Sequence, residues 1–134
     1  MSGTVLDSHA LLAFFRGEPM GVAVKALLQK AGAADQPTHM TEVNYAEVQY
    51  IIRRKNGPGA WEEAAKVLVA LPIEFHPVTR ELADVAAVFK SRFAISLADA
   101  FAAALAKDRK AELVTGGPEF EPLKDCVKIR WLKA

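Results

Sequence analysis

Short stretches that favour β-structure alternate with longer segments of helical periodicity along the 134-residue chain. The helical segments carry apolar residues three or four positions apart, which is typical of helices that bury one face. The predicted strands are residues 3–6, 36–40, 73–78, 112–115 and 127–132, and the predicted helices are residues 8–17, 19–32, 41–56, 60–71, 79–93 and 96–110. Strands that alternate with helices need crossover connections. The pattern therefore predicts an α/β fold, a mostly parallel sheet of four to five short strands with helices on both faces.

Two of these segments differ in how clearly the sequence defines them. Pro37 lies inside the predicted strand 36–40 and lacks an amide donor, which favours a sheet edge or the first position of a strand. The helix 96–110 is defined more sharply. Ser96 and Asp99 have the spacing of a capping box, and Lys107 and Arg109 place cations in its last turn.

Composition narrows the possible classes of protein. Half of the residues are apolar and a quarter are charged, and no linker or internal repeat divides the chain, so we expect residues 1–134 to form one domain. The formal net charge of +1 gives no strong positive field for nucleic-acid binding. The single cysteine excludes an internal disulfide, and no uncharged run is long enough to cross a membrane. A cytoplasmic protein is expected.

Asp7 is the first of three acidic residues in positions where a solvated surface carboxylate is not expected. It follows the predicted strand 3–6 directly, and ligands of α/β folds bind beyond the carboxyl ends of the strands. An N-cap role for the following helix explains Asp7 equally well. A phosphoryl-accepting role is disfavoured, because Ser8 and His9 follow it and the second acid usual beside such an aspartate is absent.

Glu47 and Asp99 are the other two acidic residues in positions where a surface carboxylate is not expected. Glu47 lies at helical spacing from Val43 and Ile51, so it falls within an apolar stripe, where an unpaired carboxylate is costly. The alternative is a helix rotated so that Glu47 lies at the margin of the stripe, paired with a cation one or two turns on. A capping box with Ser96 would explain Asp99 without any functional role. Asp99 also lies at the start of a helix face of small residues, which lets another element approach the helix 96–110 closely.

Three carboxylates that converge would raise one another's pKa unless a divalent cation supplied the missing charge. Oxygen ligands select hard ions such as Mg2+ or Mn2+, and such a site catalyses phosphodiester hydrolysis. The lone cysteine lies near the chain end and suggests no nucleophilic triad. His9, His39 and His76 share no metal-ligand spacing, so each histidine is predicted to be structural or on the surface.

The order of Asp7, Glu47 and Asp99 resembles that of the PIN-domain nucleases, and more closely the VapC-like ribonuclease toxins of toxin–antitoxin pairs. The matching stretches are VLDSHALLAFF, TEVNYAEV, SLADAFAAALA and LVTGGPEF, which together span nearly the whole chain. The resemblance implies a three-layer sandwich, a pocket for Mg2+ or Mn2+, cleavage of single-stranded RNA, a small antitoxin partner and a homodimer. It implies that Asp7 and Asp99 are the principal metal ligands, and that Glu47 holds metal or orients the attacking water.

The last motif departs from this family. Its members commonly read Thr-Gly-Asp followed by Phe three residues later, whereas here Thr115, Gly116 and Phe120 are present but Gly117 replaces the acid. The loss of a fourth carboxylate predicts reduced or single-metal activity, unless Glu119 compensates for it. The alternative is a catalytically impaired PIN domain that acts as an RNA-binding or protein-interaction module.

Overall fold

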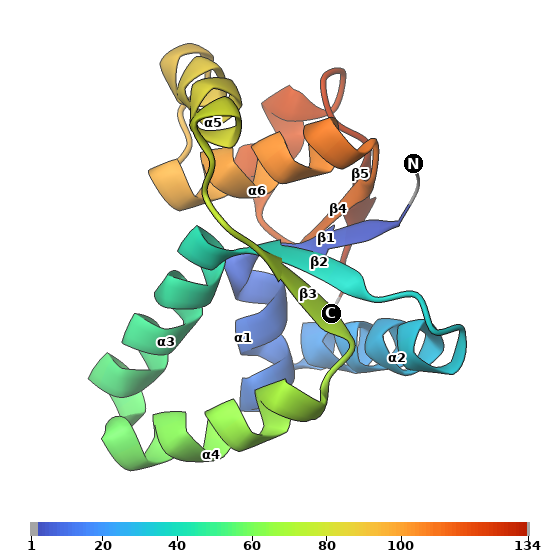
Figure 1. The fold of residues 1–134 in the computed structure, drawn as a ribbon, viewed down its shortest axis with the longest axis vertical. Coiled ribbons are helices and arrows are strands. Elements are labelled where there is room, and N and C mark those ends of the chain that lie inside the picture. Colours follow the sequence, from blue (N-terminus) through green and yellow to red (C-terminus); the bar gives the residue numbers. More distant parts are fainter. Residues whose placement is uncertain (1–2, 134) are drawn as a thin grey trace.

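The computed structural model describes residues 3–133 and shows one five-stranded sheet between two layers of helices (Figure 1). Every strand pairs in parallel with its neighbours, in the order β3-β2-β1-β4-β5. The strands are β1 (Thr4–Leu6), β2 (Thr38–Thr41), β3 (Ile73–His76), β4 (Glu112–Thr115) and β5 (Ile129–Trp131). The predicted fold class, a parallel α/β sheet with helices on both faces, is confirmed.

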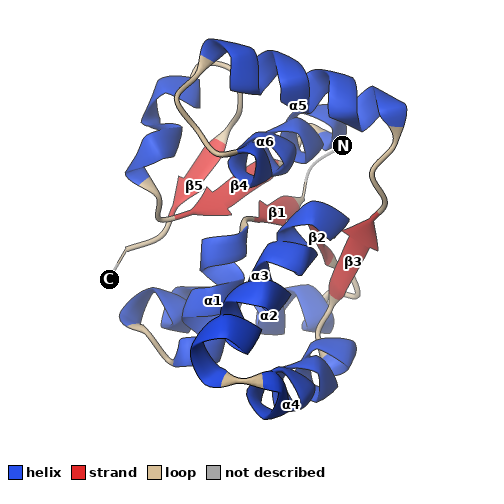
Figure 2. Ribbon diagram, turned by 90° about the vertical axis from the view of Figure 1, so that its left-hand side faces the viewer, coloured by secondary structure: helices blue, strands red, loops and turns tan. Residues whose placement is uncertain are grey.

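Six α-helices cover the two faces of the sheet (Figure 2). The helices form two groups, one on each face of the sheet, as both ribbon views show. The first group is α1 (Ser8–Arg16), α2 (Pro19–Ala33), α3 (Glu42–Asn56) and α4 (Pro58–Ala70), and the second is α5 (Arg80–Arg92) and α6 (Leu97–Arg109). A short 3-10 helix, η1 (Pro118–Leu123), occupies the loop that the sequence left without an element.

Successive apolar side chains of the strands point to opposite faces of the sheet and contribute to the hydrophobic core on each face. Val5 of β1 and Leu113 of β4 belong to the cluster formed with α5 and α6, whereas the next residues, Leu6 and Val114, belong to the cluster on the α1–α4 side. All four are fully buried. Successive side chains of a strand point to opposite faces, so an apolar run buried on both sides is what a parallel sheet requires.

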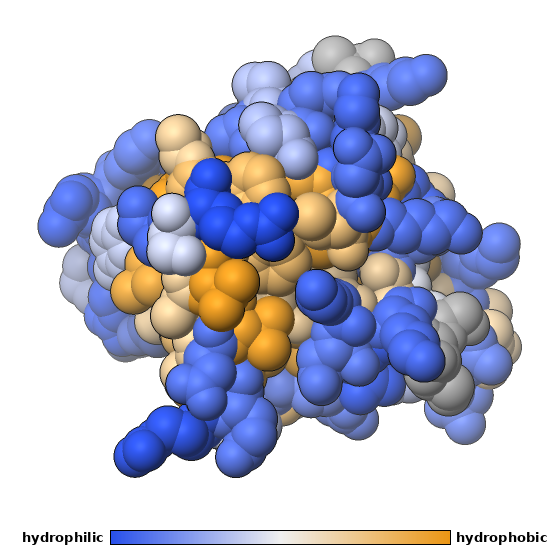
Figure 3. All heavy atoms as spheres, turned by 90° about the horizontal axis from the view of Figure 1, so that it is seen from above, coloured by the Kyte–Doolittle hydropathy of each residue, from blue (hydrophilic) through white to orange (hydrophobic). Residues whose placement is uncertain are grey.

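The outer surface of the α5–α6 layer is apolar in its middle and hydrophilic around it (Figure 3). Val88 of α5 and Leu97 of α6 are 54% and 55% exposed. Among residues 3–133, no helix is both long and apolar enough to span a bilayer.

For two elements the structure decides between alternatives that the sequence left open. The strand containing His39 is not at the sheet edge, since β2 lies between β1 and β3, and Pro37 directly precedes its first residue. The core face of α3 is formed by Asn44, Val48 and Ile52, which are buried. This rotation leaves Glu47 half-buried at the margin of the core face.

Candidate active site

Asp7 lies where β1 ends and α1 begins, with its side chain fully buried. One carboxylate oxygen accepts a hydrogen bond from the Ala10 amide at 2.8 Å, so Asp7 is the N-cap that the sequence allowed. The other oxygen accepts from the Thr115 hydroxyl at 2.5 Å. Asp7 is thus held in one orientation, beyond the carboxyl end of the sheet's central strand.

Thr115 connects Asp7 to the glycine loop. It ends β4, the neighbour of β1, and its hydroxyl accepts a hydrogen bond from the Gly117 amide at 3.0 Å while donating to Asp7. The sequence placed both residues at strand ends, and adjacent parallel strands bring those ends together. The predicted supporting role of Thr115 therefore has a structural basis, a two-bond chain from the loop amide to the Asp7 carboxylate.

Asp99 approaches the same site from the first turn of α6. Its amide donates to the Ser96 hydroxyl at 3.0 Å, as in the predicted cap, and the residue is 7% exposed. Burial, followed by the negative charges of Glu119 and Asp7, raises the pKa of Asp99 to about 7. Burial also raises the pKa of Asp7, which reaches only about 6 because the hydrogen bond from Thr115 opposes the shift. The two acids therefore share one electrostatic site.

Glu119 brings a third carboxylate to this site. The charge of Glu119 raises the pKa of both Asp7 and Asp99. A Cβ atom built on Gly117 would lie 2.5 Å from a carboxylate oxygen of Glu119 and 2.8 Å from its carboxyl carbon. The Glu119 carboxylate consequently fills the space next to Gly117 that an acidic side chain at that position would enter.

Asn44 is a buried polar residue that our reading of the sequence missed. Its amide nitrogen donates to the Ser8 hydroxyl at 3.0 Å and to the Ala98 carbonyl at 3.1 Å. Ser8 follows Asp7 and Ala98 precedes Asp99, so one side chain of α3 joins the two acid-bearing segments. A polar residue between apolar neighbours on a helix was the available signal.

Glu47 stays at the periphery of this arrangement. It lies three residues after Asn44 and four after Val43, and Val43 packs against the core cluster of the α5–α6 layer. Residues at this spacing share one side of a helix, so Glu47 lies on the side of α3 that faces α6. Glu47 forms no ion pair among residues 3–133, which removes the proposed pairing with a cation. Its role as a metal ligand stays a prediction.

The donor set fits a hard divalent cation. Asp7, Asp99 and Glu119 offer carboxylate oxygens without a basic side chain among the groups that shift the pKa of Asp99. The raised pKa values of Asp7 and Asp99 mean that their ionised forms would be stabilised by a nearby positive charge. His9, whose charge lowers the pKa of Asp7, lines a hollow beside this cluster together with Gly116, Gly117 and Glu119.

Each histidine was predicted to be structural or on the surface, because the three share no metal-ligand spacing in the sequence, but the structure brings two of them together. His39 and His76 meet in neighbouring strands with Glu74 between them. The three residues lie in β2 and β3 and are not part of the cluster around Asp7.

Comparison with known proteins identifies the family to which the chain belongs. The PIN domain family matches residues 4–125. The fold is similar to that of a chain in the DNA-bound VapBC2 complex of Rickettsia felis, with 15% identity, a TM-score of 0.76 and coverage of 99% of this chain and 100% of that one. DNA-bound VapBC of Salmonella typhimurium matches at 14% identity and a TM-score of 0.76, over 97% and 98% of the two chains.

A third structure, VapC20 of Mycobacterium tuberculosis, is described as a toxin that cleaves the sarcin-ricin loop. It is 17% identical, with a TM-score of 0.66 and coverage of 83% of this chain and 87% of that one. A comparison with curated protein sequences finds no match.

Proposed function

The chain belongs to the PIN domain family, and on this premise we propose that it is a metal-dependent endoribonuclease that cleaves single-stranded RNA. The observation that carries the proposal is the meeting of Asp7, Asp99 and Glu119 at the carboxyl end of the parallel sheet, with the pKa of both aspartates raised. Such clustering of perturbed acids marks functional sites. The sarcin-ricin loop cleavage ascribed to VapC20 supports RNA as the substrate class.

Asp7 and Asp99 would hold Mg2+ or Mn2+, and the bound ion would polarise the phosphodiester and activate water for attack. The chain's own contribution is positional. Thr115 and the Ala10 amide fix both oxygens of Asp7, so its remaining lone pairs point in set directions. Glu119 adds negative charge beside Asp99, and Glu47 on α3 is proposed to complete the ligand set or to orient the water.

The alternative of a catalytically impaired PIN domain rests on Gly117. The position of the Glu119 carboxylate weighs against it, because a carboxylate is present where the missing side chain would have been. If Glu119 supplies that charge, the site keeps four acids in all, counting Glu47. We therefore favour an active enzyme over a binding module.

The test is cleavage of single-stranded RNA with Mg2+ or Mn2+, comparing the native chain with Asp7→Asn and Asp99→Asn. Both variants keep side-chain size, and we expect a loss of at least about hundredfold, since even residues that only support metal ligands contribute 10- to 100-fold. Glu121→Gln, an exposed acid paired with Lys124, is the matched control and should cut normally. Equal cutting by all the proteins, or none with either ion, would sink the enzymatic proposal and favour the binding module.

We further propose a small cognate antitoxin and a homodimer as partners. The first is supported by the VapBC complexes, whose chains share this fold. The second is supported by the resemblance to VapC-like toxins and by the exposed apolar side chains of α5 and α6. Light scattering on the purified chain should give twice the monomer mass, and a monomer at all concentrations would contradict the dimer.

A further inference from the structure

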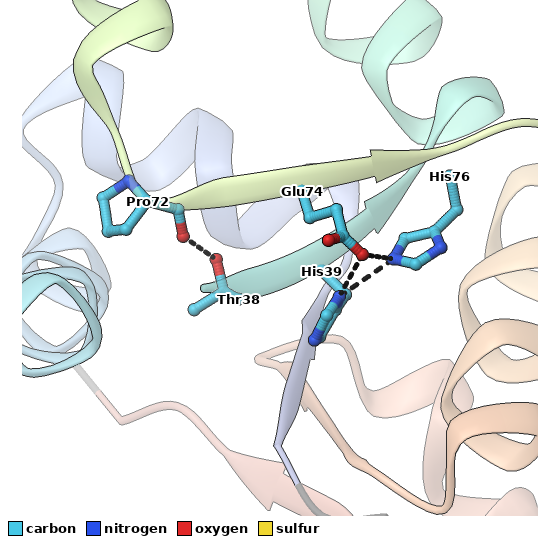
Figure 4. Close-up of polar contacts among 5 residues, drawn as sticks. All are labelled: Thr38, His39, Pro72, Glu74 and His76. Atoms are coloured by element: carbon cyan, nitrogen blue, oxygen red, sulfur yellow. Dashed lines mark hydrogen bonds and ion pairs between the residues drawn. The ribbon is translucent and has the colours of Figure 1, made fainter. Parts of the chain in front are cut away.

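A second cluster of potential metal ligands lies on the two strands at one end of the sheet (Figure 4). Nδ1 of His39 is 2.9 Å from Nε2 of His76. An oxygen of Glu74 is 3.1 Å from the same His76 nitrogen and 3.6 Å from the His39 nitrogen. The three side chains therefore direct one ligand atom each toward a common point.

The strand register produces this convergence. His39 is opposite Glu74, and Thr41 is opposite His76, in the parallel pairing of β2 with β3. Because side chains two residues apart share a face, His39, Glu74 and His76 all point to the same side of the sheet. Thr38 donates its amide and its hydroxyl to the Pro72 carbonyl at 2.8 and 3.0 Å, which fixes the start of the pairing. The backbone pairing of β2 with β3 thus fixes the positions of the residues that carry the three ligand atoms.

The three contacts cannot all be good hydrogen bonds. If the His39 nitrogen carries the proton and donates to His76, the Glu74 oxygen faces the His76 lone pair at 3.1 Å. If the His76 nitrogen carries it, one N–H group is shared between His39 and Glu74, and the 3.6 Å contact joins two acceptors. If both nitrogens carry protons, both can donate to Glu74, but the two N–H groups then oppose each other at 2.9 Å. No arrangement of protons on the two rings therefore satisfies all three contacts, whereas a cation between the three atoms would.

Charge around the cluster favours neutral imidazoles. His39 is 6% exposed, and burial lowers the pKa of both histidines, with a further lowering by the positive charge of Arg109. Glu74 raises both pKa values, and Asp108 raises that of His76. Arg109 disfavours a cation nearby, but Glu74 and Asp108 supply two opposing negative charges. Neutral rings leave their lone pairs available for coordination.

We propose that His39, Glu74 and His76 form a binding site for a transition-metal ion of the zinc class. Two imidazole nitrogens and one carboxylate suit zinc-like ions, whereas Mg2+ prefers oxygen ligands alone. Bond lengths of about 2.0–2.1 Å in tetrahedral geometry separate ligand atoms by about 3.3 Å. The observed separations of 2.9, 3.1 and 3.6 Å scatter around that value, so small side-chain rotations complete the site.

The proposed zinc site is separate from the acidic cluster. Asp99 lies in the first turn of α6, whereas Arg109, whose charge acts on both histidines, ends that helix. Ten residues of α-helix span about 15 Å. An ion in the zinc site would join the edge strand β3 to the inner strand β2, and so would stabilise the edge of the sheet.

The experiment uses the full chain with Asp99→Asn, which weakens the acidic cluster, and compares it with the double variant Asp99→Asn/His76→Gln. In the first protein we expect one equivalent of Co2+ to give the visible absorption of a tetrahedral site. Zn2+ should raise its Tm in a concentration-dependent manner, because an ion that binds only the folded state stabilises it. The double variant should lose both responses, and Mg2+ should cause neither.

Glu74 provides a second variant, since its side chain is half exposed and its removal leaves the core intact. Glu74→Gln in the Asp99→Asn background should weaken Zn2+ binding by at least about tenfold while leaving Tm without Zn2+ nearly unchanged. The proposal is overturned if the His76→Gln and Glu74→Gln proteins bind Zn2+ as the Asp99→Asn protein does, or if that protein binds none. Neither result bears on RNA cleavage by the native chain.

Discussion

At the scale of single residues, Gly117 and Glu119 show how a loop can keep a charge while moving it two positions along the chain. Gly117 has φ −81° and ψ 119°, a conformation open to any L-residue, so its backbone does not demand glycine. What excludes a side chain is the Glu119 carboxylate, which lies within 2.8 Å of the Cβ position. An acidic side chain at position 117 therefore cannot be present together with the side-chain conformation that Glu119 adopts here.

Moving the acidic side chain from position 119 to position 117 tests whether Glu119 replaces the acid that is absent at Gly117. We expect Glu119→Ala to lower Mn2+ affinity and cleavage by about tenfold or more, because it removes a carboxylate that acts on Asp7 and Asp99. Gly117→Asp/Glu119→Ala should recover most of that loss, while Gly117→Asp alone should gain little. Calorimetric Mn2+ titration and RNA cleavage are the measurements.

Glu121→Ala is the control for the exchange, since Glu121 is exposed and paired with Lys124. The interpretation would be contradicted by a Glu119→Ala protein that binds Mn2+ as the native chain does. A large gain from Gly117→Asp alone would show instead that the native site is impaired and that Glu119 does not compensate.

At the scale of elements, the side chain of Asn44 links α3 by hydrogen bonds to Ser8 of α1 and to Ala98 of α6. Asn44→Ala would leave the Ala98 carbonyl and the Ser8 hydroxyl without this donor in the interior. Each unsatisfied buried group costs about 1–3 kcal/mol, so the two groups together predict a loss of about 2–6 kcal/mol in unfolding free energy. Metal affinity should fall as well, because Asp7 and Asp99 lose their common support. Urea unfolding and Mn2+ titration measure the two effects.

Asn56→Ala is the matched control, since it changes an exposed asparagine at the other end of the same helix. The Asn56→Ala variant should leave both the unfolding free energy and the Mn2+ affinity nearly unchanged. If the two alanine variants lose stability equally, the hydrogen bonds of Asn44 do not hold the helices together.

The contact between α1 and α2 depends on Gly21. A Cβ atom there would lie 2.7 Å from the carbonyl carbon of Ala13 and 3.0 Å from the Cα atom of Phe14, both backbone atoms of α1. Gly21→Ala should therefore destabilise the protein by about 1–3 kcal/mol, the usual cost of overpacking. Gly32→Ala, in the same helix, meets only Pro72 at 3.7 Å and should stabilise by up to about 1 kcal/mol. Thermal unfolding of the pair measures the contrast, and equal effects would refute it.

The elements themselves were predictable because hydrophobic periodicity and caps are local properties. Asp7 and Thr115 could be placed together because both close strands that a parallel sheet brings side by side. The pairing of His39 with His76 could not be predicted, since it depends on which strands are neighbours, and Pro37 was compatible with an edge strand as well as with the first position of a strand. Asn44 was missed because a buried polar residue is stable only through partners on other elements, here Ser8 and Ala98.

At the scale of the whole molecule, the raised pKa values of the acidic cluster make folding stability depend on pH. The pKa values of Asp7 and Asp99 rise from an ordinary 3.8 to about 6 and about 7. Between about pH 4 and pH 7 the folded chain therefore binds more protons than the unfolded chain, so these groups favour folding at low pH and disfavour it at high pH. The lowered pKa values of His39 and His76 act in the opposite direction below their ordinary value of 6.5.

A comparison of the native chain with Asp99→Asn isolates the acidic contribution, because both proteins keep the two histidines. Without metal, we expect Asp99→Asn to become more stable relative to the native chain as pH rises from 4 to 8. The change should be at least about 1 kcal/mol, since one pKa unit corresponds to about 1.4 kcal/mol. Adding Mn2+ at pH 8 should stabilise the native chain and reverse the difference, because the cation neutralises the ionised carboxylates. A stability difference that stays constant with pH, measured by urea unfolding, would show that burial and the charges of Glu119 and Asp7 do not raise the pKa of Asp99.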